Sequence, residues 1–147
     1  MYYLHPVRED RERYTDWLAE ANGSREGIPD LMENAVLYVI EIDGREVGEA
    51  VVAEDGDGVC TLRSICVTKE ERRKGNGSLL MVNLFFLFAP RCSLMRTEAA
   101  GDLEPFFGKL GFSRAGERPS GALVLERALK TGCACCEKEK AERGEGV

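Results

Sequence analysis

The sequence predicts a single α/β (α+β) domain in which three antiparallel strands lead into a glycine loop and a long helix. The segments 36–42 and 46–53 are apolar and β-compatible, and they flank the Asp43-Gly44 pair, a strong signal for a tight hairpin turn. A second acidic, glycine-containing turn over 54–58 precedes a third such segment at 59–67. The chain has 147 residues, which is enough for one domain with a sizeable core.

The remaining elements follow from local patterns. Tyr14, Trp17, Leu18 and Ala21 fall on one face of an amphipathic helix, and we expect Trp17 to pack in the core. The other expected elements are a first strand at 2–7, a short helix at 28–34, a helix at 78–89, a strand at 92–97, a helix at 103–110, a strand from Phe112 and a last strand at 122–129. The domain is expected to span 1–130, and 131–147 is a polar, cysteine-containing C-terminal tail that we expect to be flexible.

Charge and composition narrow the function classes. The net charge of −6 argues against a nucleic-acid surface as the main role. The longest apolar run, 79–89, is too short to span a membrane, and the first residues do not form a secretory signal. Six cysteines without such a signal indicate free thiols in a reducing cytoplasm.

The segment between the strand 59–67 and the following helix predicts an anion site. It carries three cationic side chains and two glycines directly before the helix, in the order Arg72, Arg73, Lys74, Gly75, Asn76, Gly77 and Ser78. Unpaired N–H groups and a partial positive charge at a helix N-terminus attract anions, and glycine permits close backbone approach. The spacing fits neither the nucleoside-triphosphate loop nor the dinucleotide fingerprint, so we expect a phosphate or pyrophosphate of another ligand.

Two motifs together resemble the GNAT superfamily of N-acetyltransferases. Arg72-x-x-Gly75-x-Gly77 is similar to the pyrophosphate loop of that family, and 105–112 is similar to its FYEKLGF segment. The resemblance covers about 3–129. It implies a mixed, mostly antiparallel central sheet with a V-shaped splay and helices on both faces. It also implies acetyl-CoA as co-substrate and a primary amine of a small molecule or peptide as acceptor, which attacks the thioester directly.

The resemblance also assigns residues. Backbone N–H groups near the glycine loop would hold the pyrophosphate, the strand edge 65–67 would pair with the pantetheine amides, and the Val67 N–H would be the oxyanion donor. The expected cofactor contacts are Ile65, Cys66, Val67, Arg72, Arg73, Lys74, Gly75, Asn76, Gly77, Ser78 and Phe107.

The sequence offers two carboxylates as candidate bases and no evident proton donor. Some family members have a glutamate where this chain has Thr61, which cannot act as a base, so Glu49 and Glu98 are the available carboxylates. Phe107 stands where a tyrosine is frequent and cannot donate a proton. Either CoA leaves as a thiolate or another group is the donor, and a non-catalytic acyl-CoA-binding module is the alternative reading.

A narrower resemblance concerns four short segments. The segments 26–28, 62–65, 97–100 and Phe106-Phe107 together are similar to a GNAT branch encoded beside arsenic-resistance proteins, in which the double phenylalanine is usual. In the tail, Cys133, Cys135 and Cys136 could bind a soft metal or metalloid ion, although three thiolates are one fewer than a closed zinc site needs. A thiol-based metal- or metalloid-binding module is therefore part of the alternative function, and a tail with unliganded thiols is the other possibility.

The helix at 78–89 is apolar on nearly every face. A helix of this kind needs cover on both sides. Either the termini of the chain cover the outer face or the helix forms a homodimer interface, and we predict the dimer.

Overall fold

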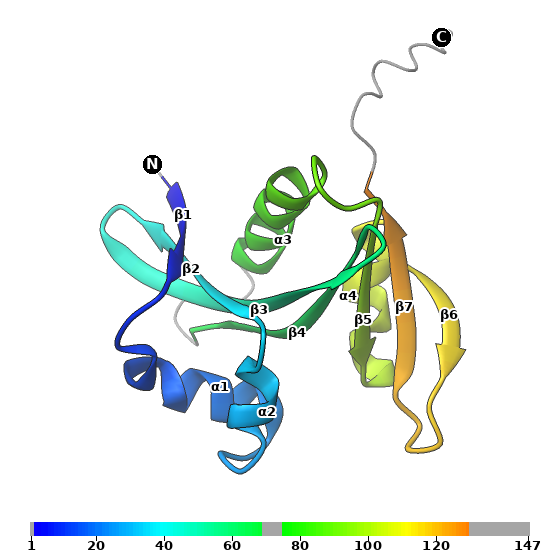
Figure 1. The fold of residues 1–147 in the computed structure, drawn as a ribbon, viewed down its shortest axis with the longest axis horizontal. Coiled ribbons are helices and arrows are strands. Elements are labelled where there is room, and N and C mark those ends of the chain that lie inside the picture. The colour runs from blue at the N-terminus through cyan, green and yellow to red at the C-terminus, as the bar shows by residue number, and fades with distance from the viewer. Residues whose placement is uncertain (1, 69–74, 130–147) are drawn as a thin grey trace, which may run out of the picture.

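The fold is a single mixed sheet with helices on both of its faces, as the family resemblance implies (Figure 1). The computed structural model describes residues 2–68 and 75–129. Within these residues, seven strands are arranged in the order β1-β2-β3-β4-β5-β7-β6. They are β1 (Tyr2–Val7), β2 (Val36–Ile42), β3 (Arg45–Gly56), β4 (Val59–Val67), β5 (Leu94–Ala99), β6 (Ser113–Glu117) and β7 (Leu123–Ala128). All neighbouring strands are antiparallel except β4 and β5, which are parallel.

The helices divide between the two faces. α1 (Thr15–Asn22) and α2 (Ile28–Met32) lie below the sheet in Figure 1, and α3 (Asn76–Phe88) lies above it. α4 (Glu104–Lys109) follows a short 3-10 turn, Gly101–Leu103, and another 3-10 turn, Arg11–Tyr14, precedes α1.

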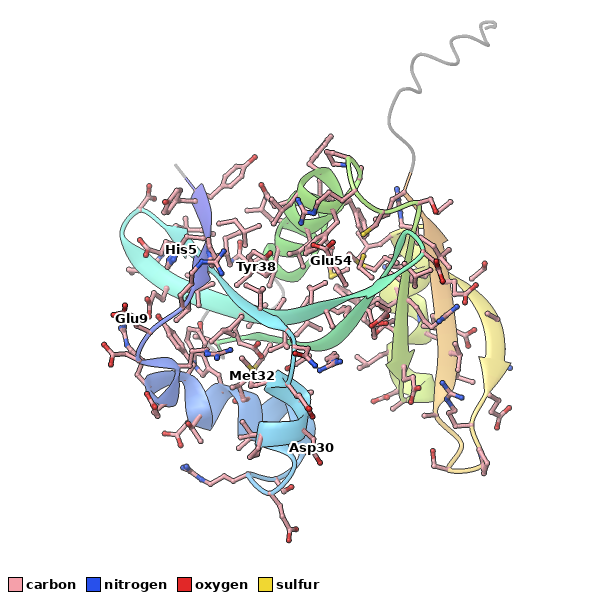
Figure 2. The ribbon with its side chains drawn as sticks, viewed as in Figure 1. His5, Glu9, Asp30, Met32, Tyr38 and Glu54 are labelled. Atoms are coloured by element: carbon pink, nitrogen blue, oxygen red, sulfur yellow. The ribbon has the colours of Figure 1, made fainter. Side chains whose placement is uncertain are left out.

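Two apolar clusters form the core. The larger one joins α3 and α4 to the sheet, and it contains Tyr38, whose ring meets Phe88 edge-on at a centroid distance of 5.8 Å. Figure 2 shows Tyr38 on the side of the sheet that α3 covers. The smaller cluster joins α1 to β2 and β3 through Tyr14, Leu18 and neighbouring side chains, with Trp17 half-buried at its edge. The predicted packing role of Trp17 is therefore confirmed.

The Asp-Gly turns have the expected geometry. Asp43 and Gly44 both have positive φ, 52° and 82°, as a type I′ turn requires. Asp57 and Gly58 repeat this pattern between β3 and β4, with φ of 57° and 77°. These two turns fix the register of the three strands that lead into the glycine loop.

β4 and β5 separate partway along their length. Their parallel pairing runs from Val59 opposite Leu94 to Leu62 opposite Thr97, and β4 continues to Val67 beyond the last pair. The two strands therefore splay apart, as the resemblance implies. The opening connects the face of the sheet that α1 covers with the face that α3 covers. The candidate site described below lies beside it.

Several predicted boundaries are wrong by a few residues. The strand predicted at 92–97 is β5 at Leu94–Ala99, because the Cys92 N–H donates to the Phe88 carbonyl at 2.8 Å and completes the turn after α3. α3 begins two residues earlier than predicted, since Gly75 with φ of 83° already turns the chain into the helix. β3 is longer than predicted, and α2 ends at Met32.

The outer face of α3 remains apolar and exposed. Phe86 is 77% exposed, and Val82 and Leu87 are also partly open to solvent. In the part of the chain that the structure describes, no helix has the length and apolar character needed to cross a membrane.

Candidate active site

The start of α3 provides a backbone site for an anion. Gly75 adopts a left-handed conformation, and its carbonyl accepts the first bond of the helix, from the Leu79 N–H at 3.0 Å. The N–H groups of the first turn lack partners within the helix and point away from its N-terminal end. Gly77 is the second residue of α3, and a Cβ added there would lie 3.4 Å from two ring carbons of Phe106.

A cavity of about 430 Å³ adjoins this end of α3. Three elements line it: β4, the first turn of α3, and the segment that leads into and through α4. The lining residues are Ile65, Val67, Gly75, Gly77, Ser78, Leu103, Phe106 and Phe107. The predicted cofactor residues at these positions of β4 and the glycine loop are therefore brought together, with Phe107 opposite them. The volume of this cavity falls within the range of small-molecule binding sites.

A second, smaller cavity of about 90 Å³ lies at the opening between β4 and β5. Ala21 from α1 contributes to it, together with residues 62–65 of β4 and 97–99 of β5. Ile65, Leu103 and Phe107 line both cavities. The two cavities therefore border the same three side chains, one on the side of α3 and the other on the side of α1.

Glu49 is buried directly behind the second cavity. Its side chain is fully buried, and its Oε2 accepts a hydrogen bond from Ser64 Oγ at 3.0 Å. Its Oε1 has no hydrogen-bond partner among the described residues. Burial raises the pKa of Glu49 to about 8, and the bond from Ser64 only partly offsets this effect. Because Ser64 lines the second cavity, it separates the carboxyl group from any molecule bound there.

The two carboxylates that the sequence offers as bases lie in different environments. Glu49 is buried, whereas Glu98 is half exposed. Glu98 lines the second cavity, but its side chain is 48% exposed and it forms an ion pair with Arg118 at 2.8 Å. Thr61 donates a hydrogen bond to Asp55. His5, the only histidine of the sequence, is part of β1 (Figure 2), and its Nε2 lies 2.9 Å from Glu41 Oε2. β1 is an edge strand three places from β4, so the histidine is remote from both cavities.

Phe107 occupies the junction of the cavities as a packed aromatic ring. It is 2% exposed and meets the rings of Phe106 and Phe112 nearly edge-on, at centroid distances of 5.0 and 5.2 Å. The ring shapes both cavities and supplies no proton.

Some predicted site residues are not placed by the structure. Arg72, Arg73 and Lys74 of the anion loop and Cys133, Cys135 and Cys136 of the tail lie outside the described residues. Cys66 and Asn76 are buried, Cys66 in β4 and Asn76 at the first position of α3.

Comparison with known proteins decides the family. A family model described as an acetyltransferase (GNAT) domain matches residues 33–114, which is more than half of the chain. The chain belongs to the GNAT acetyltransferase family. Acetyl transfer is the general reaction of this family. No relative is found among curated proteins.

Solved structures of acetyltransferases have the same fold as this chain. A GNAT family acetyltransferase from Elizabethkingia anophelis with acetyl-CoA bound has a TM-score of 0.77 and 15% identity, covering 87% of this chain and 98% of that one. A Bacillus subtilis acetyltransferase in complex with CoA has a TM-score of 0.75 and 14% identity, with coverage of 88% and 99%. The ribosomal-protein-S18-alanine N-acetyltransferase from Escherichia coli has a TM-score of 0.72 and 16% identity, with coverage of 91% and 97%. At these identities the likeness shows the fold, and the arsenic-resistance-associated branch stays a prediction.

Sequence reasoning missed the Glu49–Ser64 pair and the role of Leu103. Ser64 stands in β4 between Leu62 and Cys66, so a polar residue among inward-facing positions was the available signal. Its pairing with Glu49 depends on the cross-strand register, in which Glu49 lies opposite Cys66. Leu103 ends a 3-10 turn and carries no local signature of a binding residue.

Proposed function

We propose that this GNAT protein is an acetyl-CoA-dependent N-acetyltransferase that moves the acetyl group to a primary amine of a small molecule or peptide. One observation carries the proposal: two cavities reach the opening between β4 and β5 and share Ile65, Leu103 and Phe107. A thioester entering from the α3 side and an amine entering from the α1 side would meet at these residues. This arrangement suits direct attack, because it brings two substrates together without a covalent enzyme intermediate.

The larger cavity is the proposed acetyl-CoA site. The N-terminal turn of α3 would hold the pyrophosphate, with Arg72, Arg73 and Lys74 as further contacts that the structure does not describe. The β4 segment 65–67 would bind the pantetheine arm, and the Val67 N–H would stabilise the oxyanion. Acetyl-CoA supplies the acetyl group, and these residues bind it, orient it and, at Val67, stabilise the charge on its carbonyl oxygen.

We assign the role of base to Glu49, acting through Ser64. The amine nitrogen attacks the thioester carbonyl carbon, the new C–N bond forms, and the C–S bond then breaks. The proton of the amine passes to Ser64 Oγ, while the Ser64 proton passes to Glu49 Oε2 over the 3.0 Å hydrogen bond. A pKa of about 8 makes this carboxylate a stronger base than an ordinary one, which is an advantage for accepting a proton from an amine. Phe107 cannot protonate the sulfur, so CoA leaves as a thiolate.

An amine screen tests the proposed function. The full chain is incubated with acetyl-CoA and a panel of primary amines, and both CoA and acetylated amine are quantified by mass spectrometry. We expect at least one amine to yield N-acetyl product in equal amount to CoA. Release of CoA that is independent of every amine would contradict amine transfer.

A second candidate is a non-catalytic acyl-CoA-binding module, and Phe107 is the observation that favours it. A buried ring without a hydroxyl stands where the family resemblance places a frequent tyrosine, so this position donates no proton to CoA. Saturable acetyl-CoA binding without turnover of any amine would support this candidate. The thiol-based metal- or metalloid-binding version involves Cys133, Cys135 and Cys136, which lie outside the described residues.

We also propose a homodimer formed through α3, in a cytoplasmic protein that does not bind nucleic acid. The support for the dimer is the apolar patch of Val82, Phe86 and Leu87, which the described residues leave exposed. Sedimentation at micromolar concentration should show a dimer, and Phe86→Glu should shift it to a monomer because a charge would be buried in the interface. A monomeric wild-type protein under these conditions would refute the dimer.

A further inference from the structure

Arg63 occupies an irregular position in β4. In the pairing of β3 with β4, Val51 lies opposite Ser64 and Val52 lies opposite Leu62, so Arg63 is the extra residue of a β-bulge. Bulges re-aim side chains and are frequent beside functional sites. This one falls directly after Leu62, the last residue of β4 that pairs with β5. Arg63 therefore stands at the mouth of the opening between the two strands.

The Arg63 guanidinium is held by one of its nitrogens. Its Nη1 donates to the carbonyl oxygens of Asp30, Leu31 and Glu33, at 3.4, 3.0 and 2.6 Å. These carbonyls belong to the C-terminal end of α2, where helical carbonyls lack partners and a cation is favourable. Figure 2 marks this end of α2 with Asp30 and Met32.

The opposite edge of the guanidinium, formed by Nε and Nη2, is available for a ligand. Within residues 2–68 and 75–129, neither nitrogen has a hydrogen bond or an ion pair. Two parallel N–H groups on such an edge match the two oxygens of a carboxylate. Glu98 lines the same cavity, but its carboxylate is engaged by Arg118 at 2.8 Å.

The available edge lies next to the proposed proton route. Arg63 and Ser64 are consecutive residues, and both line the second cavity. We propose that the acceptor is a small amino acid or similar amine with a nearby carboxylate, and that Arg63 binds this carboxylate. The inference rests on the proposed amine transfer and names its substrate class. The cavity of about 90 Å³ is small, so it would hold the head of the acceptor, where amine and carboxylate stand together.

The test compares each amino acid with the amine that remains after decarboxylation. The pairs are alanine with ethylamine, leucine with 3-methylbutylamine and phenylalanine with 2-phenylethylamine, each assayed with acetyl-CoA by quantifying the N-acetyl product. The enzymes are wild type, Arg63→Gln, Arg63→Lys and, as a charge-matched control, Arg114→Gln. Arg114 lies on β6 in an exposed ion pair with Glu104.

The decisive quantity is the ratio of kcat/KM for the amino acid to kcat/KM for its amine. In Arg63→Gln we expect this ratio to fall about 10- to 100-fold for the acids that wild type accepts, the size of a lost charged hydrogen bond. Arg63→Lys should restore part of it, and Arg114→Gln should leave it unchanged. An amino acid and its amine differ in basicity, but this difference is the same for all four enzymes. It therefore cancels when the ratio of one enzyme is compared with that of another.

The outcomes separate this inference from the proposed function. If Arg63 only anchors α2, its variants will slow acids and amines by the same factor, and the inference is overturned. Transfer to the plain amines alone overturns it too, while the N-acetyltransferase proposal stands. Absence of transfer to every member of the panel and of the wider amine screen overturns both.

Discussion

Replacing Glu49 with glutamine should stabilise the protein above neutral pH and nearly abolish its activity. The carboxyl group is fully buried, and one of its oxygens lacks a partner among the described residues. Ionising it inside the protein is therefore unfavourable, which raises the pKa of Glu49 to about 8. Glutamine keeps the shape and can keep the contact with Ser64, but it carries no charge.

The sign of the pH dependence follows from proton binding. In the unfolded chain a glutamate ionises near pH ~4.3, whereas Glu49 of the folded protein holds its proton up to about pH 8. The unfolded state therefore binds fewer protons between these values, and the wild-type free energy of unfolding falls as the pH rises through this window. At about 1.4 kcal/mol per pH unit, the contribution amounts to a few kcal/mol by pH 8.

Urea unfolding of wild type and Glu49→Gln at pH 5, 6, 7 and 8 measures this effect. The two proteins should be similar in stability at pH 5, and the variant should be more stable by a few kcal/mol at pH 8. Glu98→Gln is the matched control, because Glu98 is half exposed and ion-paired, so its removal should change stability by less than about 1 kcal/mol. Equal pH profiles for wild type and Glu49→Gln would contradict a buried, protonated Glu49.

The same substitution should reduce kcat/KM by about 10²- to 10⁴-fold, the usual contribution of a general base. The wild-type kcat/KM should rise with pH, with an inflection near pH 8 and a plateau above it, because the ionised form of Glu49 is the active one. The variant should lack this inflection. Glu98→Gln should retain it, and a Glu98 variant that loses it would move the role of base to Glu98.

A glutamate at position 77 should abolish acetyl-CoA binding. A Cβ on Gly77 would already lie 3.4 Å from the Phe106 ring and 3.8 Å from Val67 Cγ2, so a longer side chain must enter the cavity or displace its wall. Its negative charge would also oppose the pyrophosphate at the N-terminus of α3. We expect at least about 100-fold weaker binding, the range of an anion contact replaced by repulsion.

The thermal midpoint with and without acetyl-CoA measures this loss, since a ligand that binds the folded state raises it. Acetyl-CoA should raise the midpoint of wild type and leave that of Gly77→Glu unchanged. Gly108→Glu is the matched control, because Gly108 is exposed on α4 and an added Cβ meets nothing within 4 Å. An equal rise in Gly77→Glu would show that the ligand does not use this end of α3.

The fold was largely predictable because its signals are local. Asp43-Gly44 specifies a type I′ turn by itself, and β2 has the predicted bounds. Gly75 and Gly77 likewise indicated a loop directly before α3. The start of β5 was not predictable, because Cys92 is apolar and strand-compatible, yet its N–H completes the turn after the helix.

The residues that line the larger cavity were mostly predictable from motifs, and those around the second cavity were less so. The glycine loop and Phe107 belong to contiguous motifs, whereas the Glu49–Ser64 bond joins residues of two strands whose register the sequence does not state. Arg63 has its position because of a bulge, a feature that no periodic pattern in β4 reveals. Both features depend on tertiary contacts, which a motif cannot encode.

Binding of acetyl-CoA in the cavity beside α3 is the claim on which the account depends, and calorimetric titration into the full-length protein tests it most directly. We expect saturable heat with one molecule of acetyl-CoA per chain. A flat titration for the wild-type protein would contradict the acetyltransferase account.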